Sequence, residues 1–400
     1  MAASPLVELP KNGGNDDIKA AKARALPIIQ STSKPKAAAS PQTGEPLSEM
    51  AEQLNENEKR KYKLGEGTYA IVYLGHLREN PKSLVAIKKI KVQTEFRDGL
   101  SMDAIREVKF LQELSHPNII ALHTVFSSKN QNLNLVLEFL PLGDLEQLIK
   151  DTNNIAYGVA DIKAWMGMLS RAVWFCHANF VLHRDIKPNN LLIAADGEVK
   201  LADFGLARAF ADPAMPMTHN VITRWYRPPE LFYGARHYGG AVDVWSMGTV
   251  FAELIIRTPF MAGQTEMDQV HLIAQAIGTP TEENWPGVSK LPAYIPVERK
   301  DVVPLRDRNY FQGLFGTAGT QGVDLLMKML ILDPRKRATA KQILQHEWWA
   351  AEPKPTKKEN LPKKAGGEKK MAEELKRRSG ELPEGRSDKV ARKLDFSAMR

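Results

Sequence analysis

The sequence predicts an α+β fold with two lobes, and three observations lead to this class. Short β-branched segments, broken by glycine and proline, occupy residues 60–90. One helical pattern follows them near residue 102, and the pattern becomes mainly helical after Pro141. A small β-rich part with one helix therefore precedes a larger α-helical part, and we expect a cleft between the two.

The folded block is predicted to span residues 57–350, with an N-terminal lobe at 57–140 and a C-terminal lobe at 141–350. Residues 1–56 are rich in Ala, Pro, Lys and Ser and lack periodicity, so we expect them to be disordered. Residues 351–400 have a similar composition with more basic residues, and we expect a disordered basic tail there as well.

The first lobe should contain strands and one helix. The segments YKLGEGTYAIVYLGHL, SLVAIKKIKV and NLNLVLEFL are typical of strands. Residues 102–114 have a helical pattern, for which Ser101 is a suitable N-cap. The predicted apolar face of this helix consists of Ile105, Val108, Leu111 and Leu114.

The second lobe should be built from helices. Five segments have the apolar spacing of helices: DIKAWMGMLSRAVWFCHANF, AVDVWSMGTVFAELIIR, MDQVHLIAQAIG, GVDLLMKML and AKQILQHEWW. Their order after the strands favours separate β-rich and α-helical lobes.

Composition excludes several classes of protein. The single cysteine, Cys176, cannot form an internal disulfide and is typical of a reducing compartment. No apolar run reaches the roughly 18 residues that a membrane span needs, and the N-terminus lacks a signal-peptide pattern. Most of the net charge of +8 lies in residues 351–400, which hold 15 Lys and Arg against 9 Asp and Glu. We expect a soluble intracellular protein, with no membrane contact and no direct nucleic-acid ligand.

Two short motifs in the first lobe suggest a phosphate site, although neither is specific alone. LGEGTYAIV places Gly65 and Gly67 between two strands, where glycine lets a backbone approach a phosphate; a plain hairpin would use the same glycines. VAIKK places Lys88 after three apolar residues, and a buried lysine needs an anionic partner. Glu107 on the predicted helix is the candidate partner, and an exposed Lys88 is the alternative.

The segment VLHRDIKPNNLLI, residues 181–193, is the most specific chemical signal. Many polar groups and Pro188 lie between two apolar runs, which indicates a loop held at both ends. LADFGLAR follows, with Asp203 ten residues after Ile193. The two segments provide a carboxylate that can accept a hydroxyl proton and oxygen ligands suited to Mg²⁺.

In this order and spacing, the motifs resemble the signature set of eukaryotic protein kinases over residues 60–350: a glycine loop, VAIK, HRD…N, DFG and a degenerate APE. The resemblance implies a bilobal kinase fold that binds ATP and Mg²⁺. Two departures, Ala70 for the third loop glycine and Pro228 in RPPE, remove no catalytic group. Glu230 of RPPE is expected to pair with Arg337.

The resemblance also implies a role for individual residues. Asp185 is the expected catalytic base, and Lys187 should lie near the γ-phosphate. Lys88 should bind the α- and β-phosphates and pair with Glu107, while the metal ligands should be Asn190 and Asp203. The remaining ATP-binding residues implied are Leu64, Gly65, Glu66, Gly67, Thr68, Tyr69, Ala70, Ile71 and Val72 in the glycine loop, and Glu138, Leu140 and Asp144 at the hinge and ribose.

Thr218, in the segment DPAMPMTHNVITRWYR, is the expected site of regulatory phosphorylation. The family's phosphate-binding arginines correspond here to Arg106, Arg184 and Arg208. Guanidinium groups gathered without an anion repel one another, and a phosphate on Thr218 would supply the missing charge. The alternative is a solvated loop threonine.

The same segment raises three further questions. Thr223 and the residues after it resemble a substrate platform, with Arg224 and Arg227 near the pocket for proline. Asp212 is either a fixed charge in place of a phosphate or an ordinary loop residue. In the glycine loop, Thr68 and Tyr69 lie where cell-cycle relatives carry inhibitory phosphates.

Finer motifs narrow the resemblance. GLSMDAIREVKFL resembles the cyclin-binding helix of cyclin-dependent kinases, and KPNN, MTHNVITRWYR and YGARHYG are most similar to the kinase of general transcription factor IIH, in the cyclin-dependent-kinase-activating kinase subfamily. This implies an H-type cyclin, a RING-finger assembly subunit and the transcription factor IIH core as partners. It also implies Ser/Thr-Pro repeats of the RNA polymerase II C-terminal domain as substrate, and a nuclear location.

Four alternatives stay open at this point. The chain could be a cell-cycle cyclin-dependent kinase, a kinase that activates other cyclin-dependent kinases, a non-catalytic scaffold that docks a cyclin, or a nucleic-acid binder acting through its basic tail. The tail clusters KPTKKENLPKKAGGEKK and ELKRRSG fit either a solvated tail or a nuclear-import signal.

Overall fold

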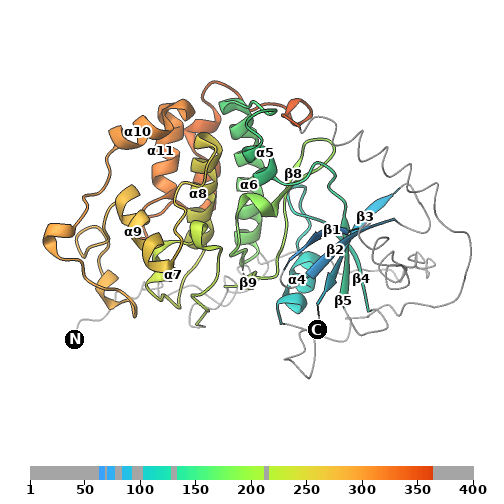
Figure 1. Cartoon of the computed structure of the whole chain (residues 1–400), viewed down its shortest axis with the longest axis horizontal. Coiled ribbons are helices and arrows are strands. Elements are labelled where there is room, and N and C mark those ends of the chain that lie inside the picture. Colours follow the sequence, from blue (N-terminus) through green and yellow to red (C-terminus); the bar gives the residue numbers. More distant parts are fainter. Residues whose placement is uncertain are drawn as a thin grey trace, which may run out of the picture. The chain divides into compact units, whose positions relative to one another are not determined.

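The computed structural model describes residues 63–67, 70–76, 83–91, 102–127, 133–210 and 216–363 (Figure 1). The N-terminal extension predicted at 1–56 and the tail beyond Lys363 lie outside these residues. Within the described ranges, every helix is too short or too polar to span a lipid bilayer.

An antiparallel five-stranded sheet forms the first lobe, as the strand patterns predict. Its order is β1-β2-β3-β5-β4, so each of the first three strands pairs with its neighbour in sequence. β5 is almost entirely buried because it lies between β3 and β4. The strands are β1 (Lys63–Glu66), β2 (Ala70–His76), β3 (Leu84–Ile90), β4 (Leu122–Ser127) and β5 (Leu133–Glu138).

Helix α4 (Met102–Glu113) lies beside this sheet (Figure 1). Of its predicted apolar face, Val108, Leu111 and Leu114 are buried as expected, but Ile105 is 44 % exposed, and Ala104 and Glu107 are buried instead. Steps of three residues drift around a helix by about 60° each, so the first residue of a series with this period leaves the face that the later ones occupy. The predicted N-cap, Ser101, lies outside the described residues.

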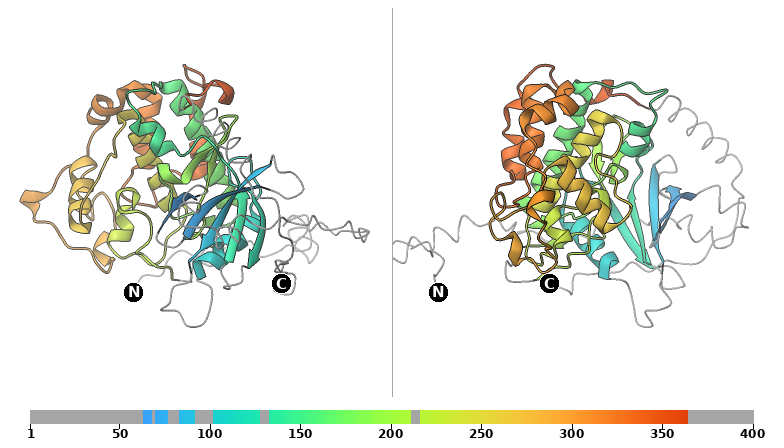
Figure 2. Two further views of the ribbon diagram at one scale, coloured as in Figure 1. Left: turned by 45° about the vertical axis from the view of Figure 1, so that its right-hand side comes forward. Right: turned by 60° about the vertical axis from the view of Figure 1, so that its left-hand side comes forward.

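Helices dominate the second lobe. The pair α6 and α8 pack side by side in its centre (Figures 1 and 2), and α8 is buried over almost its whole length. The helices of this lobe are α5 (Leu145–Lys150), α6 (Val159–Ala178), α7 (Pro229–Phe232), α8 (Ala241–Ile256), α9 (Glu266–Ala276), α10 (Arg308–Phe315), α11 (Gly319–Met329) and α12 (Ala340–Leu344).

Two small antiparallel sheets of two strands each carry the segments that matter for function. β6 (Val181–Leu182) pairs with β9 (Arg208–Ala209), and β7 (Leu191–Ile193) pairs with β8 (Val199–Leu201). The β7–β8 hairpin also joins the lobes, because the Ile120 amide donates to the Leu201 carbonyl at 3.0 Å.

The disorder predicted from residue 351 onward is wrong for residues 351–363, because the packed chain continues to Lys363. Leu361 is only 4 % exposed, and residues 358–360 form a short 3₁₀ helix. The side chain of Lys163, fully buried in α6, donates to the carbonyls of Ala351 and Pro353 at 2.8 and 2.9 Å. A buried ammonium needs such acceptors, so this contact holds a segment whose composition alone suggests disorder.

Candidate active site

Lys88 on β3 links the two lobes through carboxylates. Its ammonium lies 2.7 and 2.8 Å from the oxygens of Glu107 on α4, and 2.8 Å from Asp203 in the second lobe. Burial opposes the charge on Lys88, but the two carboxylates outweigh it and raise its pKa. The same charge and hydrogen bond lower the pKa of Asp203 although burial works against this. Burial raises the pKa of Glu107, although the Lys88 charge acts against this shift. Lys88 and Asp203 are therefore charged near neutral pH, as phosphate and metal binding require.

Asp185 sits at the centre of a hydrogen-bonded cluster in the catalytic loop. Its Oδ2 accepts from the Lys187 ammonium at 2.7 Å and from the Asn190 amide at 3.0 Å. Its Oδ1 accepts from the hydroxyl of Thr223 at 2.8 Å, and Lys187 donates to the same hydroxyl at 2.9 Å. A hydroxyl thus fits between the carboxylate and the ammonium, which is the arrangement that proton removal from a substrate hydroxyl needs.

Thr223 is a functional residue whose contact sequence reasoning missed. Its place on the platform was predicted, but 38 residues separate it from Asp185. No spacing rule in the sequence brings the two together. The contact depends on how the segment after Thr218 folds back onto the catalytic loop.

Asp243 on α8 is a second residue that the sequence analysis passed over. It is completely buried and accepts the backbone amides of His183 and Arg184, both at 2.9 Å. His177 bonds the same carboxylate at 2.9 Å. A signal was present, because an aspartate inside the apolar helical run AVDVWSMG needs strong partners. By accepting these amides, Asp243 holds the catalytic loop in a conformation that requires a left-handed φ of 63° at Arg184.

His183 connects the catalytic loop to the segment of Asp203. Its Nδ1 accepts the Asp185 amide at 3.2 Å, so Nε2 donates to the Ala202 carbonyl at 3.0 Å. Burial lowers the pKa of His183, which keeps the ring neutral and preserves this pattern. The predicted base Asp185 and the predicted metal ligand Asp203 are thereby fixed relative to each other.

The glycine loop lies at the exposed edge of the sheet. A Cβ added at Gly65 would meet no protein atom within 4 Å, so the packing around it does not demand glycine. Lys91 bonds the Glu66 carboxylate at 2.6 Å and the Gly67 carbonyl at 3.0 Å. Lys63 also contacts Glu66, and the hydrogen bonds from both lysines lower the pKa of Glu66 to about 2. The lysines therefore hold the loop through Glu66 and Gly67, while the glycines leave space for the loop backbone to approach a ligand.

The other predicted residues of this loop fall into two groups. Val72 lies directly opposite Lys88 in the β2–β3 ladder, and Ile71 opposite Lys89. Ala70 begins β2 and is buried, whereas Leu64 is 42 % exposed. The predictions for Thr68 and Tyr69 lie outside the described residues, as does that for Asp212.

At the hinge, the side chains of two predicted ATP-binding residues are engaged in structural contacts. The Glu138 carboxylate accepts the Ala121 amide at 2.7 Å and the Lys200 ammonium at 2.9 Å. Asp144 caps α5 by accepting the Gln147 amide at 2.9 Å. The Glu138 amide is also used within the fold, since it donates to the Ala121 carbonyl at 3.0 Å. Leu140 follows as a half-buried apolar residue packed against the core.

Two of the three predicted phosphate-binding arginines converge near Thr218. Arg184 donates to the hydroxyl of Tyr238 at 2.9 Å, and this hydroxyl donates to the Thr218 carbonyl at 2.6 Å. Arg208 reaches the Pro216 carbonyl at 3.5 Å. The third, Arg106, bonds Asp103 on its own helix at 2.9 Å. The structure thus brings Arg184 and Arg208 to the exposed Thr218 but leaves Arg106 paired on α4.

The platform after Thr218 is anchored by Arg227. Its guanidinium donates twice to the Ile222 carbonyl, at 3.1 and 3.2 Å, and once to Glu266 at 2.7 Å. Ile222 has a left-handed φ of 72°, which a β-branched residue rarely adopts. Arg224 extends the platform toward α9 by donating to the Gln264 carbonyl at 2.6 Å.

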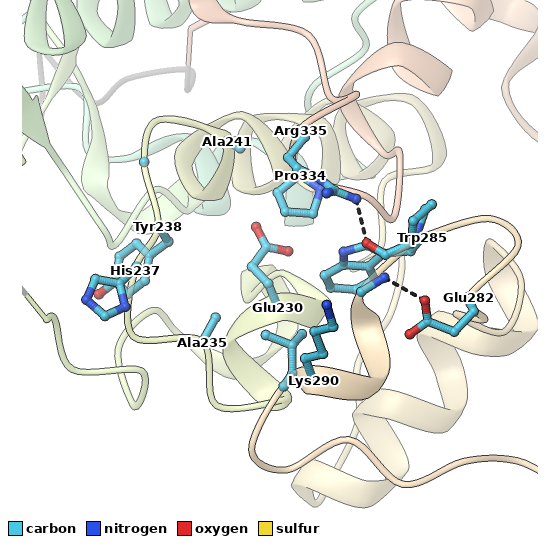
Figure 3. A pocket seen from close by; sticks show the side chains of 14 residues that line it. Glu230, Ala235, His237, Tyr238, Ala241, Glu282, Trp285, Lys290, Pro334 and Arg335 are labelled. Carbon is cyan, nitrogen blue, oxygen red and sulfur yellow. Dashed lines mark hydrogen bonds between the residues drawn. The ribbon is translucent and has the colours of Figure 1, made fainter. Parts of the chain in front are cut away.

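Figure 3 shows a pocket of about 690 Å³ elsewhere in the helical lobe. It lies among residues 235–241, the segment 282–291 and Arg335, and the buried Glu230 side chain lies centrally among the lining residues. Arg337 holds that carboxylate at 2.7 and 3.0 Å, which confirms the predicted pair. The lining includes none of the residues predicted for catalysis or ATP binding, so we place the chemistry at Asp185 and not in this pocket.

Comparison with known proteins shows the family of this chain. The protein kinase domain family matches residues 59–349. The chain belongs to the protein kinase family. It is 49 % identical over 297 residues to serine/threonine-protein kinase KIN28 of Saccharomyces cerevisiae, covering 74 % of this chain and 94 % of that protein. It is 45 % identical over 302 residues to cyclin-dependent kinase 7 of Carassius auratus, covering 75 % and 85 %.

A solved structure, described as the CAK complex from Chaetomium thermophilum bound to ATP-gamma-S, matches with a TM-score of 0.73 and 64 % sequence identity. The match covers 82 % of this chain and 100 % of that one. The predicted kinase fold and family are therefore confirmed, and the protein is a cyclin-dependent serine/threonine kinase that uses ATP.

Proposed function

We propose that this kinase phosphorylates the Ser/Thr-Pro repeats of the RNA polymerase II C-terminal domain as part of general transcription factor IIH. Support comes from the subfamily motifs of the sequence and from the similarity to KIN28 and cyclin-dependent kinase 7. The observation that carries the proposal is the platform beside Asp185, because it bears on which residue follows the phosphorylated hydroxyl.

Preference for proline after the target hydroxyl is consistent with the geometry of Ile222. Its carbonyl is already occupied by two hydrogen bonds from Arg227. The substrate residue after the target hydroxyl would lie beside Ile222, and its backbone N–H would find no free acceptor there. A buried donor without an acceptor costs about 1–3 kcal/mol. Proline has no N–H and avoids this loss.

The decisive assay compares peptides with the purified cyclin complex. We expect phosphorylation of polymerase repeat peptides and much weaker phosphorylation of histone-type peptides. Replacing the following proline with alanine should lower kcat/KM by about 10- to 100-fold, and N-methylalanine, which also lacks the N–H, should restore part of the rate. Equal rates for the proline and alanine peptides would contradict the role of Ile222 and Arg227.

Helix α4 supports the proposal that an H-type cyclin binds here. Met102 and Ile105 are 59 % and 44 % exposed on the same helix that holds Glu107 toward Lys88. Large apolar side chains exposed together on one helix mark an interaction surface more often than free surface. Affinity purification should identify the cyclin and the RING-finger subunit, and Ile105→Asp should release the cyclin.

The magnesium site of this proposal consists of Asn190 and Asp203. Both amide hydrogens of Asn190 go to Asp185, at 2.8 and 3.0 Å, so its amide oxygen is the atom presented to a metal. Together with the Asp203 carboxylate it forms an oxygen donor pair of the kind that Mg²⁺ uses with substrate phosphates. When bound, the metal would neutralise charge on the β- and γ-phosphates.

A second candidate activity is the activation of other cyclin-dependent kinases. It is favoured by the 64 % identity to a chain of the CAK complex. The test is an unphosphorylated cyclin-dependent kinase as substrate, with its own catalytic aspartate replaced. Incorporation of phosphate into its activation segment would support this activity beside the polymerase one.

For the nuclear location, the support is the basic composition of the tail. The sequence after Lys363 contains the cluster ELKRRSG and further lysines. Fluorescence imaging should show nuclear enrichment of the full chain and its loss when residues 364–400 are deleted. An unchanged distribution would favour a solvated tail.

A further inference from the structure

The segment 351–363, here called the strap, crosses from the end of the helical lobe to the β7–β8 hairpin. Figure 1 shows it in red, passing from the last helices over α6 toward β8. Thr356 bonds the first turn of α6 twice, through its amide to the Ala160 carbonyl at 3.0 Å and its hydroxyl to Asp161 at 2.7 Å. With the buried Lys163 contact, these bonds fix the path of the strap.

Lys358 brings the strap to the tip of the hairpin. Its ammonium donates to Asp196 at 2.6 Å and to Glu198 at 2.9 Å. Its carbonyl lies against Gly197, where an added Cβ would come within 2.0 Å of that oxygen. Gly197 also has a φ of 89°, so only glycine serves both the turn and the close approach. Main chain and side chain of Lys358 therefore hold the same three-residue turn.

The hairpin joins this turn to the two proposed metal ligands. β7 begins directly after Asn190, and β8 ends two residues before Asp203. A displacement of the turn at residues 196–198 would therefore move both Asn190 and Asp203 through these two short strands.

Glu198 extends the connection into the first lobe. Its side chain is only 15 % exposed, and its second oxygen accepts from the Asn118 amide at 2.6 Å. Asn118, which is buried, also accepts the Leu201 amide at 2.8 Å through its carbonyl. The chain of contacts from Lys358 thus reaches the loop that follows α4, the helix that carries Glu107.

We propose that Lys358 is a positioning residue for nucleotide binding, which sets the separation of Asn190 and Asp203 by holding the tip of the β7–β8 hairpin. This inference rests on the proposed metal role of those two residues. It assigns a function in the ATP site to a segment whose hydrogen bonds, among the described residues, go to α6, the hairpin and its own neighbours and to none of the predicted nucleotide-binding residues.

The test measures binding of ATPγS to the full-length chain, once with Mg²⁺ and once with EDTA. Lys358→Met removes the charge, Lys358→Arg keeps it, and Lys354→Met is the matched control, because the Lys354 ammonium bonds Glu352 and Ala350 of its own segment. We expect Lys358→Met to reduce the affinity gained from Mg²⁺ by about 2- to 30-fold. Lys358→Arg and Lys354→Met should keep it. Amide hydrogen exchange over residues 190–203 should rise in Lys358→Met alone.

Two results would overturn the inference. One is that Mg²⁺ increases the ATPγS affinity of Lys358→Met as much as that of the wild type. The strap would then only stabilise the fold, even if the melting temperature of the variant were lower. The other is a loss in Lys354→Met as large as in Lys358→Met. Failure of the wild type to phosphorylate polymerase peptides would leave this binding result intact and would count against the proposed substrate only.

Discussion

The catalytic loop and the segment around Thr218 differ in how many hydrogen bonds their key side chains make. In the catalytic loop, the buried Asp243 accepts two backbone amides, and Asp185 has bonded groups on both carboxylate oxygens. Around Thr218, the side chain is exposed, and the contact of that residue with Tyr238 is made by its carbonyl.

The difference is between groups that are already paired and groups that could bind a further anion. The catalytic groups are aligned by hydrogen bonds within this chain. The Thr218 segment is arranged around two arginines, Arg184 and Arg208, that a phosphate would join. Arg184 belongs to both regions, since its amide bonds Asp243 and its guanidinium faces Tyr238.

The largest effect is expected in the catalytic loop itself. Asp185→Asn removes the carboxylate that accepts the substrate proton, and general bases contribute about 10²–10⁴-fold. We expect kcat to fall by that factor in a phosphate-transfer assay, while ATPγS affinity stays near the wild-type value. An unchanged kcat would show that Asp185 is not the group that accepts the substrate proton.

Thr218→Ala examines the other region. A phosphate there would form charge-assisted bonds of about 1.5–3 kcal/mol each with Arg184 and Arg208. The phosphorylated wild type should therefore be about 10- to 100-fold more active than Thr218→Ala, and the two should be equal before phosphorylation. Thr223→Ala is not a suitable control, because Thr223 contacts Asp185. His219→Ala, beside Thr218, should respond to phosphorylation as the wild type does.

Asp243→Asn measures how much of the alignment comes from one buried carboxylate. Asparagine keeps the shape but loses the charge that strengthens both amide bonds. We expect the free energy of unfolding to fall by about 1.5–3 kcal/mol and kcat by about 10-fold. Asp301→Asn on the surface should change neither, as urea unfolding and steady-state kinetics can show. Loss of stability with kcat unchanged would mean that Asp243 does not align the loop.

The smallest effect is expected on the pH dependence of stability, through Glu253, which contacts Tyr226 of the platform. Burial raises the pKa of Glu253 from 4.5 to about 7, although the hydroxyl of Tyr226 bonds it at 2.8 Å. The folded state thus binds this proton more tightly than the unfolded state. Its contribution is complete below pH 4.5 and is lost as the pH rises through about 7. Glu253→Gln should remove this slope and stabilise the protein by about 1–3 kcal/mol above neutral pH.

Glu282 provides the matching contrast on the surface. Backbone amides of Gly287 and Ser289 lower its pKa to about 2, so its contribution is lost as the pH falls. Unfolding curves of Glu253→Gln and Glu282→Gln should therefore differ from the wild type with opposite pH dependence. If both variants changed the stability with the same pH dependence, burial would not be the cause of the raised pKa of Glu253.

Local patterns were enough for much of the fold and for the chemical groups. Strand and helix patterns give the two lobes, and the motifs give Lys88, Asp185, Asn190 and Asp203, because these residues occur in a fixed order along the chain. The prediction failed where burial depends on partners distant in sequence. Ile105 has the residue type of a core position but faces outward, and the strap has the composition of a disordered tail but packs on Lys163.

The sequence by itself determined the family, the order of the lobes and the residue types that phosphoryl transfer needs. Only the tertiary structure decided that Thr223 meets Asp185, that Asp243 holds the catalytic loop, and that Lys358 reaches the β7–β8 hairpin. Periodicity and spacing record interactions within a few residues of each other. These three contacts span tens to more than a hundred residues. The buried carboxylates of Asp185 and Asp243 must find partners wherever the packed chain brings them, and Lys358 meets the hairpin because the strap is led there by its other contacts.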